Sequence, residues 1–168
     1  MDSMSRLENL LGAQSLALAD RLLAADVGPA GTGLPGSDRA ALVTLLAHPG
    51  QTVRWLGDVL GLTSSGGTRL VDRLVAAGLV TRTAGGDARQ RQLRLTRSGT
   101  VRARAVLRAR QAVLSEVLAT LTEEERHHLE ELLAKIVHGL AATRMPALRV
   151  CRMCDREACD QCPLQHTV

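Results

Sequence analysis

Aromatic side chains are almost absent from this sequence of 168 residues, which contains no Tyr, no Phe and one Trp, Trp55. A core must therefore be built from Leu, Val and Ala, and binding of a planar ligand by ring stacking would be poor. Lysine is also nearly absent, because Lys135 is the only Lys among the 21 basic residues. Arg makes bidentate contacts with phosphate and guanine, so this bias suits a polyanionic partner, although a GC-rich genome produces the same bias.

Long hydrophobic runs are absent too. No stretch approaches the roughly 20 apolar residues that span a bilayer, and charged residues interrupt the N-terminal segment throughout. We therefore expect a cytoplasmic protein with no signal peptide and no membrane partner.

Motifs of catalysis are equally scarce. The sequence has no Gly-rich phosphate loop, no nucleophile elbow and no carboxylate pair in a pattern that forms a cleft, so we do not expect an enzyme. The one feature that supports a redox enzyme or electron carrier is a group of four Cys, all of which lie in the last 18 residues. Permanent disulfides are not expected there, because the cytoplasm is reducing.

Residues 51–99 predict two short helices joined by a tight turn. Thr52 is a candidate N-cap for the first helix, and Gly61 can end it in a left-handed conformation. Thr63 or Ser64 is the candidate N-cap of the second helix, which Gly78 ends. The inward stripe of the second helix consists of Leu70, Leu74 and Val75, and its opposite face carries Ser65, Thr68, Arg69 and Arg73.

An alternating pattern at residues 79–82 and 92–96 predicts a β-hairpin with the basic segment 84–89 at its tip. Residues 51–99 contain eight Arg and three Asp, a net charge of +5, so the rest of the chain sums to −1. A helix of this kind fits the major groove of duplex DNA, and a basic hairpin can reach the adjacent minor groove. We therefore expect a winged helix-turn-helix that binds double-stranded DNA.

Four short motifs of this region resemble the MarR family of transcriptional regulators. In the order of the family pattern they are Asp72-Arg73-Leu74, Gly78-Leu79-Val80-Thr81-Arg82, Asp87-Ala88-Arg89 and Leu95-Thr96-Arg97-Ser98-Gly99. The wing departs from the pattern in being short, with Gly85-Gly86 before the Asp. The resemblance implies a DNA-binding regulator that is a homodimer and responds to an effector.

The resemblance also assigns individual residues. Ser65, Thr68 and Arg69 are expected to face the major groove, and Arg89 at the wing tip is expected to enter the minor groove. Arg73 is expected to contact phosphate or to brace the wing through Asp87. Arg91 is a further wing residue for which we expect a contact with DNA.

Four more helices are expected around this head, giving a mainly α-helical fold with a small β-wing. They cover residues 5–26, 37–47, 97–121 and 122–143, the second beginning at a Ser37-Asp38 cap and the last at a Thr122–Glu125 capping box. The long helices have apolar faces that a head of about 60 residues cannot bury, and a homodimer would cover them. The expected units are an N-terminal dimerisation helix and loop (1–36), the DNA-binding head (37–97), C-terminal dimerisation helices (98–145) and a Cys-rich tail (146–168).

The tail contains Cys151, Cys154, Cys159 and Cys162 in the spacing C-x2-C-x4-C-x2-C, after a Met145-Pro146 pair expected to end the last helix. Two such Cys pairs are typical of metal ligands, because each turn directs two thiolates at one ion. Neighbouring Arg side chains are expected to lower the thiol pKa values. Four interpretations remain open: zinc, an iron-sulfur cluster, a thiol switch or disulfide, and an inert tail.

The leading hypothesis is a homodimeric transcriptional regulator, expected to be a repressor, that reads a pseudo-palindromic operator. Its effector is a small molecule or, given the scarcity of aromatic residues, a metal or redox signal through the tail. The alternatives are a Cys-cluster electron carrier or redox enzyme, and a winged helix that binds protein instead of DNA.

Overall fold

The computed structural model describes residues 5–25, 33–84, 91–141, 144–159 and 162–164, which form a mainly helical fold with one small antiparallel sheet. This confirms the fold class expected from the sequence. In chain order the elements are α1 (Arg6–Ala24), α2 (Gly36–Ala47), α3 (Val53–Leu60), α4 (Ser64–Ala76), β1 (Val80–Ala84), β2 (Arg91–Leu95), α5 (Arg97–Leu118), α6 (Glu123–Leu140) and α7 (Arg144–Cys151). Within the described residues, no helix is long and apolar enough to cross a membrane.

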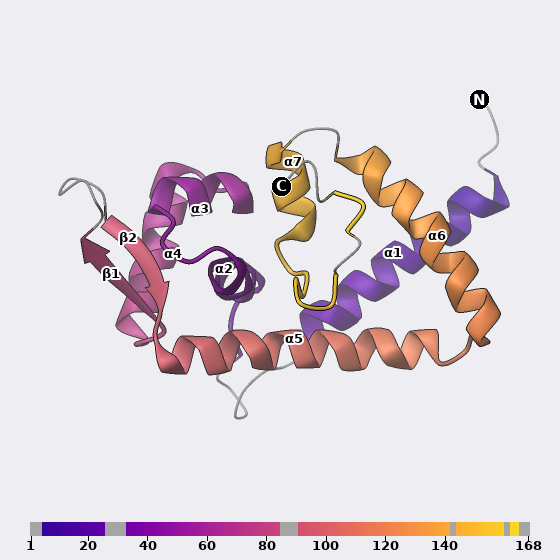
Figure 1. Ribbon diagram of the computed structural model, residues 1–168, viewed down its shortest axis with the longest axis horizontal. Coiled ribbons are helices and arrows are strands. Elements are labelled where there is room, and N and C mark those ends of the chain that lie inside the picture. Colours follow the sequence, from indigo (N-terminus) through magenta and orange to yellow (C-terminus); the bar gives the residue numbers. More distant parts are fainter. Residues whose placement is uncertain (1–4, 26–32, 85–90, 142–143, 160–161, 165–168) are drawn as a thin grey trace.

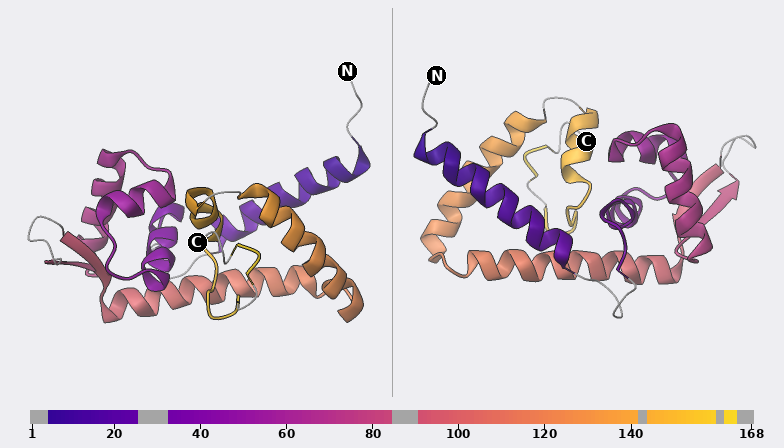
Figure 2. Two further views of the ribbon diagram at one scale, coloured as in Figure 1. Left: turned by 45° about the horizontal axis from the view of Figure 1, so that its top comes forward. Right: turned by 180° about the vertical axis from the view of Figure 1, so that it is seen from behind.

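The long helix α5 forms the base of the molecule (Figure 1). One end of α5 carries a head made of α2, α3, α4 and the β1–β2 hairpin, and the other end is flanked by α1 and α6 (Figures 1 and 2). Helix α7 and the segment after it lie between the head and α6, on the same side of α5 as both. The C-terminal segment therefore occupies the junction between the two ends of the molecule.

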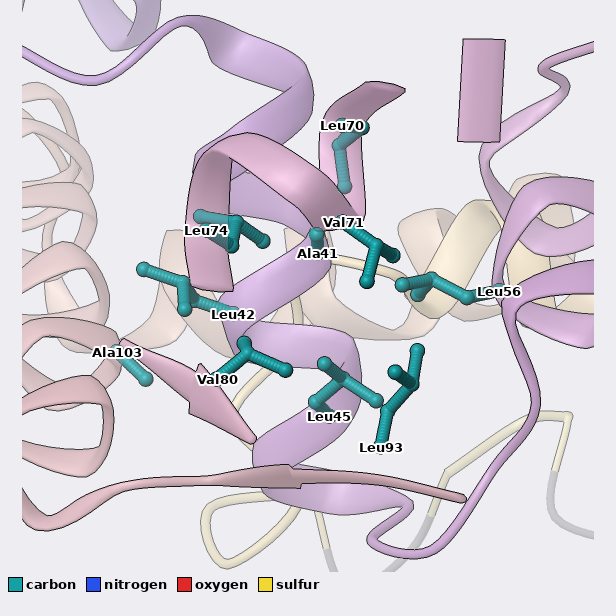
Figure 3. Close-up of a cluster of buried hydrophobic side chains, with 10 residues drawn as sticks. All are labelled: Ala41, Leu42, Leu45, Leu56, Leu70, Val71, Leu74, Val80, Leu93 and Ala103. Atoms are coloured by element: carbon teal, nitrogen blue, oxygen red, sulfur yellow. The ribbon is translucent and has the colours of Figure 1, made fainter. Parts of the chain in front are cut away.

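The core of the head is aliphatic, as expected from the scarcity of aromatic residues. Ten buried side chains from α2, α3, α4, both strands and α5 meet in it (Figure 3). They are Ala41, Leu42, Leu45, Leu56, Leu70, Val71, Leu74, Val80, Leu93 and Ala103. Trp55 is only partly buried and packs against this cluster, its ring 5.3 Å from that of His48. Burial of so many branched side chains fixes α4 and the hairpin to α2, which is what holds the head together.

The local signals of the helix-turn-helix are confirmed. The Thr52 hydroxyl accepts the Trp55 N–H at 3.2 Å, and the Thr63 hydroxyl accepts the Gly66 N–H at the same distance. Between the two helices, Gly61 has a φ of 69°, a left-handed conformation that glycine adopts without steric cost. Helix α2 differs from expectation, because its N-cap is Pro35 and no side chain caps it. Asp38 points elsewhere, toward Arg73.

In the hairpin, Val80 pairs with Leu95 and Ala84 pairs with Arg91. A single β-bridge from Gln51 to Leu93 ties β2 to the residues just before α3. Thr96 then joins the hairpin to α5. Its hydroxyl donates to the Gly78 carbonyl at 2.8 Å and accepts the Gly99 N–H at 2.9 Å. The wing and the long helix are thus connected by a hydrogen-bonded turn instead of a loose linker.

The helices at the other end have no buried residues in this single chain. Both α1 and α6 begin with a complete capping box, at Ser5 and at Thr122, so that backbone N–H groups at the N-terminus of each helix have hydrogen-bond acceptors. Their apolar faces nevertheless remain exposed, as does Val101 of α5. The exposed large apolar residues are Leu7, Leu10, Leu11, Leu16, Leu23, Val101, Leu118, Leu132, Leu133, Ile136 and Leu140.

The expected end of the last helix at Met145-Pro146 is wrong. Helix α6 already ends at Leu140, and α7 begins anew at Arg144, so that Pro146 stands in the first turn of a helix. A proline is tolerated there because the first backbone nitrogens of a helix have no intrahelical acceptor to lose. The consequence is that Cys151, the first cysteine, is the last residue of a helix packed against α3 and α6.

Candidate nucleic-acid interface and cysteine segment

Helix α4 has one fully buried side and one exposed side. Leu70 and Val71 are at most 1% exposed in the core, whereas Ser65, Thr68 and Arg69 are exposed. The Thr68 hydroxyl donates to the Ser64 carbonyl at 3.0 Å, and the Ser65 hydroxyl lies 3.3 Å from that of Thr63. The three residues expected to read the major groove therefore lie together on the solvent side of a rigid helix.

Two ion pairs fix the orientation of α4. Arg82 of β1 donates to Asp72 at 2.7 Å, which ties the wing to the helix. Arg73 donates to Asp38 of α2 at 2.7 Å, and the Asp38 side chain is only 4% exposed. Arg73 was expected to contact phosphate or to brace the wing through Asp87. Asp87 lies outside the described residues, and within them the partner of Arg73 is Asp38.

The wing is described only in part. Arg91 begins β2 and is exposed, and Arg94 of the same strand is exposed as well. Arg89, expected to enter the minor groove, lies outside the described residues. Strand β2 pairs with β1, and β1 is tied to α4 by the ion pair between Arg82 and Asp72, so the hairpin that carries Arg91 and Arg94 is fixed to the helix.

Cys151 is the last residue of α7, and the other three cysteines follow it in a segment whose described residues form neither helix nor strand. The Cys154 N–H donates to the Cys151 carbonyl at 2.9 Å, which closes a tight turn over the first pair. In the second pair the Leu164 N–H donates to Cys162 Sγ at 3.4 Å. All four are free thiols, and among the described residues no three His, Cys, Asp or Glu side chains are arranged as ligands of one metal ion.

The thiols nevertheless interact with one another. Burial, followed by the nearby Cys154 and Cys162, raises the pKa of Cys151 to about 12. Burial, followed by Cys162 and Cys154, raises the pKa of Cys159 to about 11. Arg156 lowers the pKa of both thiols, as expected of a neighbouring Arg, but burial and the other cysteines outweigh it, so both pKa values are raised.

The other two Arg residues expected near the thiols make contacts elsewhere. The Arg149 guanidinium donates to the Asp58 carbonyl at 3.1 Å and lies against Gly61, in the turn between α3 and α4. The Arg152 side chain donates back to the Arg149 carbonyl. On the other side, the Thr44 hydroxyl of α2 donates to the Arg152 carbonyl at 3.2 Å. The cysteine segment is therefore docked on the helix-turn-helix.

A cavity of about 510 Å³ lies where α1, α2, α5 and the cysteine segment meet. Its walls are largely aliphatic, with Leu22, Leu23 and Val106 among them, and Arg152 and Met153 bring the cysteine segment into the same lining. The buried Arg39 also borders it and donates to three carbonyls at the end of α1, those of Leu22, Leu23 and Ala25. This cluster of hydrogen bonds joins α1 to the head.

Sequence reasoning did not identify Asp38, Arg39 or Arg149 as residues that organise the site. Each acts on a partner far away in the sequence, at α4, α1 and α3 respectively. A signal was present for Asp38 and Arg39, two charged residues just before the apolar run AALVTLLA. A charge next to such a run must be paired when it is buried.

Comparisons with known proteins agree with this architecture. Residues 32–90 match the sequence model of the MarR family. The YusO protein from Bacillus subtilis is 26% identical, with a TM-score of 0.65 over 77% of this chain and 91% of its own. For a probable transcriptional regulator from Pseudomonas aeruginosa the identity is 28%, with a TM-score of 0.58 over 78% of this chain and 99% of its own.

A third structure shares the fold at lower identity. The Mycobacterium tuberculosis MarR family protein Rv2887, in complex with salicylic acid, is 24% identical, with a TM-score of 0.61 over 80% of this chain and 98% of its own. Among curated proteins, none matches this sequence.

Proposed function

We propose that the chain is a member of the MarR family, whose model matches residues 32–90, and that it is a homodimeric regulator of transcription that reads a pseudo-palindromic site on double-stranded DNA. The observation that carries the proposal is the exposed side of α4, where Ser65, Thr68 and Arg69 lie opposite a fully buried stripe. Such a helix can enter the major groove and present hydroxyl and guanidinium groups to base edges. The exposed Arg91 and Arg94 of the wing are suited to phosphate contacts, which position the protein on the duplex.

Selection from a random duplex pool tests this function. We expect enrichment of a site with two related half-sites about one helical turn apart, since a two-fold dimer places its recognition helices at that spacing. We also expect the logarithm of the binding constant to fall linearly with the logarithm of salt concentration, by about 0.9 for each phosphate neutralised. Equal affinity for all duplexes would refute sequence reading, and no affinity for DNA would favour a winged helix that binds protein.

We propose a second copy of the chain as the partner for α1 and α6. Their Leu and Ile residues are exposed on both helices, α1 and α6 lie at the same end of α5 (Figure 2), and exposed apolar residues that gather in this way are typical of a protein interface. A two-fold axis through this region would bury the surface on both copies at once. The two heads would then point outward, each with its own α4.

The variant Ile136→Asp is expected to dissociate the dimer. Ile136 is 44% exposed on the apolar side of α6, and a carboxylate buried there at an interface would lose its hydration without a partner. Sedimentation velocity should show a monomer for this variant and a dimer for the parent chain. The matched control is His138→Asp, two positions later and on another side of the helix, which should remain dimeric. Dissociation of both variants, or of neither, would contradict the proposed interface.

We propose repression as the outcome of binding, because a dimer that covers an operator within a promoter excludes polymerase. The signal that relieves it would act at the cavity between α1, α2 and α5. Rv2887 was solved with salicylic acid, and the arginines around this cavity suit an anion, although no aromatic ring lines it. The cysteine segment borders the same cavity through Arg152 and Met153, so a metal or redox change there would reach the same junction.

The competing function is a Cys-cluster electron carrier or redox enzyme. It is favoured only by the cysteine segment. Neither the buried stripe of α4 nor its exposed polar side is needed for electron transfer or redox catalysis. A purified chain that shifts a specific duplex and transfers no electrons to artificial acceptors would exclude it. Electron transfer without any affinity for duplex DNA would overturn the function proposed above.

A further inference from the structure

The turn between α3 and α4 is supported by a residue from outside the helix-turn-helix. The Arg149 guanidinium of α7 donates to the Asp58 carbonyl of α3 at 3.1 Å, although 91 residues separate the two in the sequence. A Cβ atom built on Gly61 would lie 3.4–3.6 Å from three atoms of the same guanidinium. One planar side chain therefore binds the end of α3 and covers the residue that follows this helix.

The end of α3 is a place where an added donor matters. Carbonyl groups in the last turn of a helix have no donor within the helix and carry partial negative charge. The Gly57 carbonyl accepts the Leu62 N–H at 2.9 Å, but the Asp58 carbonyl accepts the Gly61 N–H at 3.3 Å, longer than the usual range of about 2.7–3.2 Å. The Arg149 guanidinium gives Asp58 a second, charge-assisted hydrogen bond. It thus stabilises the turn where the local hydrogen bond is weakest.

Helix α7 is held in place on the side away from Arg149. Ala147 is fully buried with Ala141 and Leu164, and Val137 of α6 packs against this cluster. Successive residues of an α-helix are about 100° apart, so Arg149 lies nearly opposite Ala147. Helix α7 packs against α6 as well as α3, and Figure 1 shows it between α6 and the head. Arg149 is therefore presented to the turn from a fixed base.

We propose that Arg149 is a positioning residue for DNA binding, which holds the turn between α3 and α4 in the geometry that presents α4 to the duplex. The turn of a helix-turn-helix sets the angle between its two helices. Helix α4 begins at Ser64, three residues after Gly61, and carries Ser65, Thr68 and Arg69 on its exposed side. This role rests on the proposed function, because it concerns the same side of α4.

A direct contact with phosphate is the alternative role for Arg149, whose side chain is exposed. Without any DNA, however, the guanidinium already donates to the Asp58 carbonyl and lies against Gly61. A phosphate would have to compete with both contacts. The two roles also differ in what they predict for the salt dependence of binding, because only a phosphate contact releases a counterion from the DNA.

Hydrogen exchange on the full chain without DNA tests the support of the turn. Arg149→Ala should speed exchange of the Gly61 and Leu62 amides at least about tenfold, the effect of losing a hydrogen bond from a charged donor. Amides of β1 and β2 should exchange as in the parent. The matched control is Arg156→Ala, which removes an exposed Arg from the cysteine segment (residues 151–164) and should leave the turn unchanged. Unchanged exchange at the turn in Arg149→Ala, or an equal increase throughout the head, would overturn the assignment.

The effect on DNA is measured by fluorescence anisotropy on the selected duplex at several salt concentrations. Arg149→Ala should weaken binding about 2- to 30-fold, the range for a residue that acts through another, and should keep the salt dependence of the parent. Arg149→Lys should also bind more weakly than the parent, because it retains the charge without the planar group that covers Gly61. Arg156→Ala should bind as the parent does.

Two results on DNA would overturn the positioning role. One is a salt slope lower by about 0.9 in Arg149→Ala, which indicates a lost phosphate contact. The other is full affinity in Arg149→Lys together with fast exchange at Gly61 and Leu62, which shows that charge alone is needed. Failure of the proposed function gives a different result: the parent binds no duplex, while Arg149→Ala still speeds exchange at the turn.

Discussion

Replacement of Gly99 by Ala is expected to destabilise the protein by about 3 kcal/mol or more, the upper end of the cost of overpacking. A Cβ atom at this position would lie 2.0 Å from the Leu79 carbonyl oxygen and 2.9 Å from its carbon. Both atoms belong to the backbone, so no side chain can rotate away. Relief would require α5 to move from the hairpin, which would break the hydrogen bonds of Thr96 to Gly78 and Gly99.

Chemical denaturation at one fixed protein concentration measures this loss, because the proposed dimerisation would make apparent stability depend on concentration. The control is Gly12→Ala in α1, where a Cβ would meet no atom within 4 Å. Ala is the better helix former by about 0.5–1 kcal/mol, so this variant should be as stable as the parent or slightly more so. If both variants unfold at the same denaturant concentration, the close approach of α5 to Leu79 is wrong.

Replacement of Arg69 by Ala is expected to weaken binding of the selected duplex by about 1–3 kcal/mol, the cost of removing a bidentate contact with a base. Arg69 is exposed on α4, next to Thr68 and one turn after Ser65. Because nothing is buried by this side chain, the stability of the protein should remain that of the parent. The loss should also be larger on the selected site than on unrelated duplexes.

The matched control for charge is Lys135→Ala, which removes one positive charge from an exposed position on α6, far from the head in the fold. Anisotropy titrations at one salt concentration should give nearly unchanged affinity for this variant. If both variants lose the same affinity on every duplex, Arg69 contributes charge without reading bases. An unchanged affinity for Arg69→Ala would remove α4 from the assigned interface.

The features that could be predicted from the sequence are those set by neighbouring residues. Thr52 and Thr63 cap their helices, and Gly61 takes the left-handed conformation of the turn, because each needs a partner only three or four residues away. The aliphatic core of the head also followed from the pattern, since apolar residues at helical and strand spacing leave one buried side.

The features that could not be predicted depend on tertiary contacts. Asp38 stands at a helix start and fits the pattern of a cap, but burial beside Arg73 gives it a distant partner. Val101 has the apolar spacing of an inward residue of α5, yet it stays exposed, whereas Ala103 two residues later is buried in the core of the head. The docking of Arg149 on α3 has no local signal at all, because 91 residues separate it from Asp58.

The turn at Thr96 gives α5 the mechanical role of a lever. Its 22 residues are continuous with the wing through the hydrogen bonds to Gly78 and Gly99, so the head cannot tilt without carrying the helix along. A helix of that length spans about 33 Å at 1.5 Å per residue, and a rotation of about 10° at one end moves the other by about 6 Å. In the proposed dimer, a displacement of that size would change the separation of the two heads by a sizeable part of a DNA turn. Small movements at the far end of α5 would then suffice to take both copies of α4 out of register with the grooves of the DNA.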